Sequence, residues 1–179
     1  MAAQFTVDLE WPEHALLRPT HWPKYNDEAN QATYQLLARL KEYRISAIFY
    51  VLGEVAYRCP ELIKLIQREN HQIGSHGFWH RHGERQGDRS DWLARQYLPL
   101  CVLYRSPYWD TTPRPGLIGG AHFRLLPYWL MKREVVRTGM FAVHPHDFFP
   151  QATGPLRRRF GTRTAWNRLD RLLTEVPFV

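Results

Sequence analysis

Strand-like and helix-like segments alternate along this chain of 179 residues, and no other sequence feature constrains its fold as strongly. Short apolar runs bounded by turn residues predict buried strands, whereas apolar residues three and four positions apart predict helices. Their alternation predicts a mainly parallel sheet covered by helices. The expected strands are residues 5–10, 45–52, 72–75, 101–104, 122–126 and 140–144. The expected helices run from 26 or 27 to 40, from 60 to 66, from 88 or 90 to 97, from 127 to 137 and from 164 to 174.

The length of the chain limits how far such a sheet can close. A complete eight-unit (β/α) barrel takes about 250 residues, which is more than the 179 residues present. We therefore expect one α/β domain over residues 1–179, either a smaller or incomplete barrel or an open sheet. Both architectures place the active site at the carboxyl ends of the strands.

The composition is that of a globular protein, with 44% hydrophobic and 23% charged residues, which argues against a disordered chain or a coiled coil. No apolar run approaches the roughly 20 residues of a membrane-spanning helix, and we expect no signal peptide before the first strand. The two cysteines, Cys59 and Cys101, fit neither a disulfide nor a zinc pattern. A reducing, cytoplasmic location is the simplest expectation.

The net charge of +7 favours anionic partners, although only weakly. The densest basic run, Arg157–Arg159, has no nucleic-acid-binding motif beside it. We therefore expect this run to be a solvent-exposed surface away from the active site, and we expect no nucleic-acid partner. An oligomer is compatible with the sequence.

Two acids end the first expected strand. Asp8 and Glu10 are two positions apart, so a strand points both side chains to the same side of the sheet. Ionised carboxylates that lie together need a cation or a shared proton. Ordinary surface acids at an exposed strand end are an equally good explanation of this pair taken alone.

Two histidines follow the expected strand at 72–75. His76 and His80 are four positions apart, and on a helical turn residues with that spacing share one face. Two imidazoles on one face can bind a zinc ion. The alternative is a polar turn with hydrogen-bonded histidines. The His-x-x-x-His spacing is common and does not by itself indicate a metal site.

An arginine and a short aromatic stretch follow the expected strand at 101–104. Arg105 lies at the carboxyl end of that strand and can pair bidentately with a carboxylate such as Asp8. Pro107, Tyr108 and Trp109 would then form a stiff aromatic wall. An ordinary surface arginine beside a packing aromatic residue is the alternative.

A further histidine, His144, ends the strand expected at 140–144. Its unperturbed pKa near 6.5 suits general acid–base catalysis, and Asp147 is close enough in sequence to orient either His144 or His146. Because all four clusters follow expected strands, an α/β fold brings them to one rim. Carboxylates, imidazoles and an arginine together are typical of a metal-assisted hydrolase.

Four stretches in this order carry a resemblance to a known family: residues 5–11, 74–80, 104–107 and 143–145. The chain resembles the polysaccharide deacetylases, the NodB-homology group of carbohydrate esterases, and is most similar to a bacterial branch found in exopolysaccharide and O-antigen gene clusters. The resemblance implies a distorted, shortened (β/α) barrel with fewer than eight units.

The resemblance also implies a role for each matching residue. Asp8 matches the catalytic base, Arg105 the residue that positions the base, and His144 the general acid. The metal ligands are implied to be Glu10, His76 and His80, and the metal a divalent ion, commonly zinc. Trp79, Pro107, Tyr108 and Trp109 are the expected substrate-binding residues.

Three functions fit these residues: an N-deacetylase of an acetamido sugar, another metal-dependent hydrolase of linear or cyclic amides, and a non-catalytic sugar-binding homologue. The last is kept because the chain departs from the family pattern. Glu10 stands where the family usually has Asp, and His146-Asp147 stands where it often has Trp-Glu. The gaps of 24 residues between His80 and Arg105 and of 38 residues between Arg105 and His144 are short.

Overall fold

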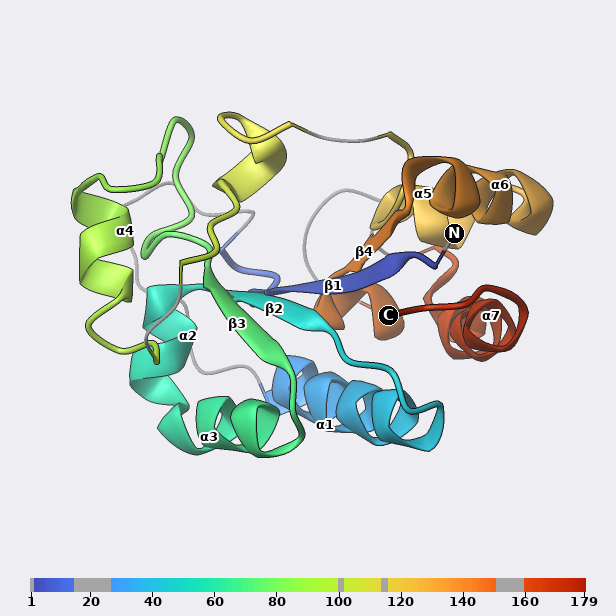
Figure 1. The fold of residues 1–179 in the computed structure, drawn as a ribbon, viewed down its shortest axis with the longest axis horizontal. Coiled ribbons are helices and arrows are strands. Elements are labelled where there is room, and N and C mark those ends of the chain that lie inside the picture. Colours follow the sequence, from blue (N-terminus) through green and yellow to red (C-terminus); the bar gives the residue numbers. More distant parts are fainter. Residues whose placement is uncertain (1, 15–26, 100–101, 114–115, 151–159) are drawn as a thin grey trace.

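The computed structural model describes residues 2–14, 27–99, 102–113, 116–150 and 160–179, and its centre is a four-stranded parallel sheet (Figure 1). The strands lie in the order β3-β2-β1-β4, so the N-terminal strand is central. All four were expected from the sequence. They are β1 Gln4–Leu9, β2 Ile48–Val51, β3 Gln72–Ser75 and β4 Met140–Val143.

Single backbone bridges extend the sheet past both of its edges. Ser75, at the end of β3, pairs in parallel with Tyr104, and Ala142 of β4 pairs in parallel with Gly119. The sheet therefore continues at each edge as an isolated pair rather than as a full strand. This is the pattern of a shortened (β/α) barrel with fewer than eight units, and it confirms the expected α/β class.

Helices surround the sheet. In Figure 1, α1 and α3 lie together along one side, α2 and α4 lie beside the β3 edge, and α5, α6 and α7 gather near the chain termini. The helices are α1 Asp27–Glu42, α2 Gly53–Arg58, α3 Pro60–Arg68, α4 Arg89–Ala94, α5 Ala121–Leu125, α6 Tyr128–Thr138 and α7 Thr162–Glu175, with 3-10 turns η1 Pro107–Trp109 and η2 Pro145–Phe148.

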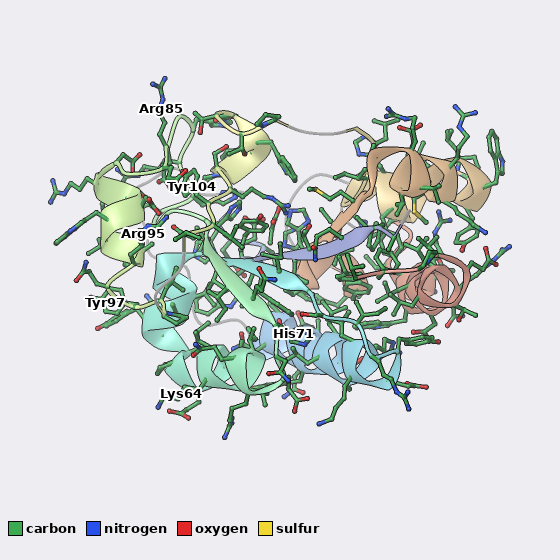
Figure 2. All side chains as sticks on the ribbon, in the orientation of Figure 1. Lys64, His71, Arg85, Arg95, Tyr97 and Tyr104 are labelled. Atoms are coloured by element: carbon green, nitrogen blue, oxygen red, sulfur yellow. The ribbon has the colours of Figure 1, made fainter. Side chains whose placement is uncertain are left out.

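The helices α3 and α4 begin where the sequence provides a start signal. Pro60 occupies the first turn of α3, where its missing N–H costs nothing. Asp88 caps α4, because its Oδ1 accepts a hydrogen bond of 2.8 Å from the backbone N–H of Asp91. Figure 2 shows Lys64 on the outer side of α3, where its Nζ lies 2.6 Å from a carboxylate oxygen of Glu61.

The core lies on both faces of β1, whose residues after Gln4 are all buried. The ring of Phe5 packs edge-on against Phe141, with centroids 5.4 Å apart, and against Phe178 at 5.5 Å. Full burial of such a side chain contributes about 1.5–3 kcal/mol. Ala3 also forms a parallel bridge with Phe178, so both chain ends pack at the same edge of the core (Figure 1).

The strand expected at residues 122–126 is wrong, because this segment forms α5. Phe123 is buried and Leu125 is 49% exposed, whereas a strand would turn these two side chains to the same face. A short apolar run does not distinguish a strand from one helical turn.

The buried strand expected at residues 101–104 is also wrong in its described part. Val102 is 81% exposed, and Tyr104 forms only the single bridge to Ser75. Cys101 and the basic run Arg157–Arg159 lie outside the described residues. No helix in the described ranges is long and apolar enough to cross a membrane.

Candidate active site

The carboxyl ends of the strands meet at a cleft of about 370 Å³. Asp8 lies near the end of β1 and Glu10 follows it, while His76 follows β3 and His144 follows β4. The four polar clusters predicted from the sequence therefore come together at one rim. The cleft is lined by Asp8, Glu10, His76, His80, Tyr108, Trp109, Ile118, Gly119, Gly120, Ala121, His122, Arg124, Ala142, His144, His146 and Asp147.

Arg105 and Asp8 form a buried ion pair. Nη1 of Arg105 donates to Oδ1 of Asp8 at 2.5 Å and also to Oγ1 of Thr6 at 3.0 Å. The guanidinium lies between the rings of Tyr50 and Trp109, 4.0 Å and 4.1 Å from their centroids. The predicted pairing is therefore present, but it uses one guanidinium nitrogen, which also donates to Thr6, and is not bidentate.

Glu10, His76 and His80 turn their polar atoms towards one another. Oε2 of Glu10 lies 3.8 Å from Nε2 of His76 and is in contact with Nε2 of His80. All three side chains are buried, and one potential ligand atom from each lies within 4.8 Å of the others.

Hydrogen bonding and burial prepare these groups as ligands. Nδ1 of His76 lies 2.8 Å from the backbone carbonyl oxygen of Arg105, so its N–H is used there and Nε2 faces Glu10. Burial lowers the pKa of His76 to about 4, which keeps the imidazole neutral. Burial by itself would raise the pKa of Glu10, but the charge and hydrogen bond of His80 hold it well below its usual range.

A divalent metal fits this set of residues. One carboxylate oxygen and two imidazole nitrogens are donors that zinc commonly takes. The three side chains are buried with these atoms facing one another, an arrangement that a cation would stabilise. Glu10, His76 and His80 therefore fit a metal site, although the sequence alone could not show that they converge.

The spacing of the two histidines suggested a helical turn, but they do not lie on one. They lie in the loop after β3, in which Gly77 has φ +72° and His80 has φ +57°. A side chain at Gly77 would require Glu84 or the loop to shift, because a Cβ would lie 2.0 Å from Oε2 of Glu84. Left-handed backbone at both positions thus brings the imidazoles together, with ring centroids 5.4 Å apart.

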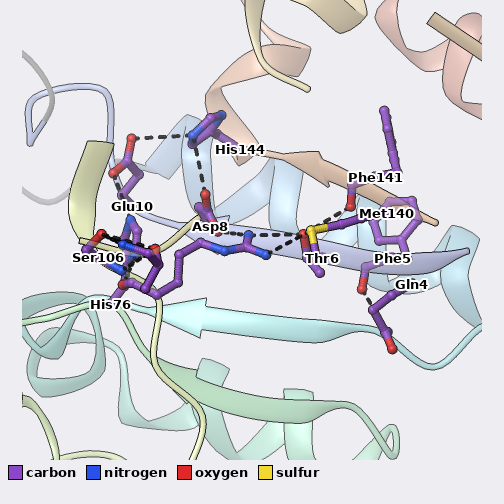
Figure 3. Close-up of polar contacts among 12 residues, drawn as sticks. Gln4, Phe5, Thr6, Asp8, Glu10, His76, Ser106, Met140, Phe141 and His144 are labelled. Carbon is purple, nitrogen blue, oxygen red and sulfur yellow. Dashed lines mark hydrogen bonds and ion pairs between the residues drawn. The ribbon is translucent and has the colours of Figure 1, made fainter. Parts of the chain in front are cut away.

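His144, which follows the neighbouring strand β4, faces the two acids. Its Nε2 lies 3.9 Å from Oδ2 of Asp8 and 4.0 Å from Oε1 of Glu10 (Figure 3). Its Nδ1 lies 3.1 Å from Oδ2 of Asp147, which also accepts the backbone N–H of His144 at 2.9 Å. Burial by itself would lower the pKa of His144, but Asp147, Glu10 and Asp8 together raise it to about 9.

Two buried residues of this wall were not predicted as site residues. Arg124 of α5 donates from Nε to Oδ1 of Asp147 at 3.0 Å, and this helix was expected as a strand. The ring of His146 stacks on that of His144, with centroids 4.7 Å apart and planes at 15°. The sequence left open which histidine Asp147 orients, and Oδ2 of Asp147 is hydrogen-bonded to the ring and to the backbone N–H of His144.

The aromatic residues expected to bind substrate divide into two groups. Tyr108 and Trp109 line the cleft, and both have positive φ, at 55° and 62°. Such strained backbone is characteristic of functional sites. Pro107 and Trp79 are not among the described residues that line the cleft. Trp79 instead lies under the guanidinium of Arg81, 5.0 Å from its ring centroid.

Comparison with known sequences points to one family. Residues 18–95, which include both His76 and His80, match the sequence model named polysaccharide deacetylase. The peptidoglycan-N-acetylglucosamine deacetylase PgdA of Listeria monocytogenes is 30% identical over 87 residues. That match covers 49% of this chain and 19% of the relative, so the chain aligns with about a fifth of that protein.

Known structures share the fold over almost the whole chain. The peptidoglycan deacetylase PdaC of Bacillus subtilis matches 99% of this chain and 86% of its own, with a TM-score of 0.61 and 15% identity. A mutant of a CE4 family pseudoenzyme from Bacillus anthracis, with restored enzymatic activity, matches 97% of this chain and 61% of its own. Its TM-score is 0.63 at 13% identity. The chain therefore has the fold of these deacetylases.

Proposed function

We propose that the chain belongs to the polysaccharide deacetylase family, whose sequence model matches residues 18–95, and that it is a metal-dependent N-deacetylase of an acetamido sugar in a bacterial polysaccharide or its precursor. The observation that carries this proposal is the meeting of Asp8, Glu10 and His144 at one cleft. Nε2 of His144 lies 3.9 Å from Oδ2 of Asp8 and 4.0 Å from Oε1 of Glu10. The reaction would hydrolyse the amide bond and release acetate.

Glu10, His76 and His80 are the proposed ligands of the metal, which we propose to be zinc. When bound there, such an ion would polarise the acetamide carbonyl and lower the pKa of water from about 15.7 towards 7. A carboxylate binds a metal in its ionised form and an imidazole in its neutral form. The low pKa of the Glu10 carboxyl and the low pKa of His76 favour these two forms.

Asp8 is the proposed general base. Arg105 occupies Oδ1 of Asp8, which leaves Oδ2 on the side of His144 and the cleft. From that position Asp8 would take a proton from the attacking water, as the new C–O bond forms at the acetamide carbon. Arg105 acts through Asp8, because it fixes the carboxylate and balances its charge.

His144 is the proposed general acid. A pKa of about 9 keeps its imidazole protonated at neutral pH, and the hydrogen bond to Asp147 leaves the Nε2 proton facing the cleft. His144 would give this proton to the sugar nitrogen as the C–N bond breaks, so the products are acetate and a free amine.

The proposed substrate is an N-acetylated hexose residue. A cleft of about 370 Å³ lies within the range of roughly 300–1,000 Å³ that is usual for small-molecule sites. Tyr108 and Trp109 provide aromatic surface at its edge, on which a sugar ring can stack. We propose the cytoplasm as the compartment, because the two cysteines of the sequence fit neither a disulfide nor a zinc pattern.

Acetate release tests the proposal. The zinc-loaded and the metal-stripped protein are each incubated with N-acetylglucosamine oligomers, with peptidoglycan and with a simple cyclic amide. We expect acetate from an N-acetylated glycan only with metal present. Hydrolysis of the cyclic amide alone would favour an amidase, and glycan binding without acetate release would favour a non-catalytic homologue. Lys64→Gln is the control variant, because this exposed side chain lies on α3 and pairs with Glu61, away from the residues that line the cleft.

A further inference from the structure

Glu10 presents its two carboxylate oxygens to two different pairs of histidines. Oε2 faces His76 and His80. Oε1 lies 4.0 Å from Nε2 of His144 and 4.0 Å from Nδ1 of His146. In this second group also, one potential ligand atom from each of the three residues lies within 4.8 Å of the others. One buried carboxylate is thus flanked by four imidazoles.

We propose that Glu10, His144 and His146 form a second divalent-cation site, so that Glu10 is shared by two ions. The donor set repeats that of the first site, one carboxylate oxygen and two imidazole nitrogens, which suits zinc. A carboxylate with one oxygen towards each site is well placed to bridge two ions, which in two-metal hydrolases lie about 3.5–4 Å apart.

The turn η2 contains His146 and is capped by His144. Asp147, on the same turn, lies 3.1 Å from Nδ1 of His144 and so directs Nε2 towards Glu10. Histidines that bind metals commonly use their other nitrogen in this way, on a carboxylate or a carbonyl. The ring of His146 lies nearly parallel to that of His144, at 15° and 4.7 Å, so both rings reach Glu10 from one side.

The second site is the weaker of the two. Two ligands of a tetrahedral zinc ion with bonds of 2.0–2.1 Å are about 3.3 Å apart. His144 and His146 both lie 4.0 Å from Oε1 of Glu10, so both must move closer to hold an ion. At the first site His80 is already in contact with Glu10. The first ion is therefore expected to bind at lower zinc concentration than the second.

An ion at the second site would inhibit the enzyme, and this consequence rests on the proposed function. The ion would occupy the Nε2 lone pair of His144, the atom from which the proposed proton transfer to the sugar nitrogen takes place. A protein with only the first site filled keeps that proton. Deacetylation would therefore rise with the first equivalent of zinc and fall with the second.

Zinc stoichiometry tests the site without reference to activity. The metal-stripped full chain is titrated with zinc and the bound ions are counted by equilibrium dialysis and elemental analysis. We expect two ions per wild-type chain, one per His146→Phe chain, and two for the control His82→Gln, whose exposed side chain pairs with Asp110. Circular dichroism verifies folding, and His146→Gln replaces His146→Phe if the larger side chain prevents it. One ion in the wild type, or two ions in the folded His146 variant, would overturn the proposal.

Acetate release during the same titration tests the inhibition. In the wild type we expect the rate to pass through a maximum, and in His146→Phe we expect the fall at excess zinc to disappear, whatever the height of its plateau. A wild-type rate that stays constant while the second ion binds would overturn the inhibitory role. If no acetate appears at any zinc concentration, the proposed function fails, while the ion count still decides whether the second site exists.

Discussion

Arg105 contacts His76 through its backbone and Asp8 through its side chain. Its carbonyl oxygen lies 2.8 Å from Nδ1 of His76, and its Nη1 lies 2.5 Å from Oδ1 of Asp8. One residue therefore orients both a proposed metal ligand and the proposed base. A displacement of the Arg105 backbone would disturb both functions, whereas truncation of its side chain would act first on Asp8.

Replacement of the Arg105 side chain should destabilise the protein through Asp8. Arg105→Met leaves a buried carboxylate without its partner, and breaking a buried pair in this way costs about 3–5 kcal/mol. Urea denaturation measures the loss. In the double variant with Asp8→Asn the buried charge is gone, so part of the stability should return. An equal or larger loss in the double variant would contradict this account.

Replacement of the two acids should separate base from ligand. Asp8→Asn keeps the shape of the side chain but cannot accept a proton, so we expect full zinc content and a turnover lower by about 10²–10⁴-fold. Glu10→Gln should instead lower zinc affinity, because a neutral amide is a poorer ligand than a carboxylate. Zinc content and acetate release are measured for both variants together. The opposite pattern of zinc loss would reverse the two assignments.

The meeting of Asp8, Arg105 and His144 could be predicted from the sequence for a physical reason. Asp8 lies near the carboxyl end of β1, and Arg105 and His144 each follow a segment that pairs in parallel. The carboxyl ends of parallel strands lie at one edge of the sheet. The prediction holds for Arg105 even though residues 102–104 form only one bridge. A single backbone pair at Tyr104 is enough to bring the next residue to the rim.

The local conformations of the site could not be predicted. His76 and His80 meet through left-handed backbone at Gly77 and His80, and His-x-x-x-His spacing alone suggests a helix. Residues 121–125 form a helix in which Phe123 packs edge-on against Phe141, with centroids 5.2 Å apart. That contact joins two separate segments of the chain, so the local sequence pattern of residues 121–125 could not predict it.

Removal of the Asp147 charge should move the pH dependence of turnover. Asp147 contributes to the raised pKa of His144, which is about 9. The proposed acid must be protonated, so activity is lost as the pH rises through that pKa. In Asp147→Asn the pKa of His144 falls, and the alkaline limb of the kcat profile should shift to lower pH. An unchanged limb would mean that His144 does not control it.

The loop that carries the two histidines should be sensitive to one methyl group at Gly77. Gly77 has φ +72°, and an added Cβ would lie 2.0 Å from Oε2 of Glu84. Gly83 is a matched control, since its φ is +80° and nothing lies within 4 Å of an added Cβ. Both alanine variants pay the left-handed backbone cost of about 1–2 kcal/mol.

Only Gly77→Ala must also move Glu84 or the loop itself, so it should lose more stability than Gly83→Ala. It should also bind zinc more weakly, because His76 and His80 flank the altered residue. Thermal unfolding of the metal-free proteins and zinc titration of each variant measure the two effects. Equal losses in the two variants would mean that the loop accommodates the methyl group, and that the contact with Glu84 does not hold the histidines in place.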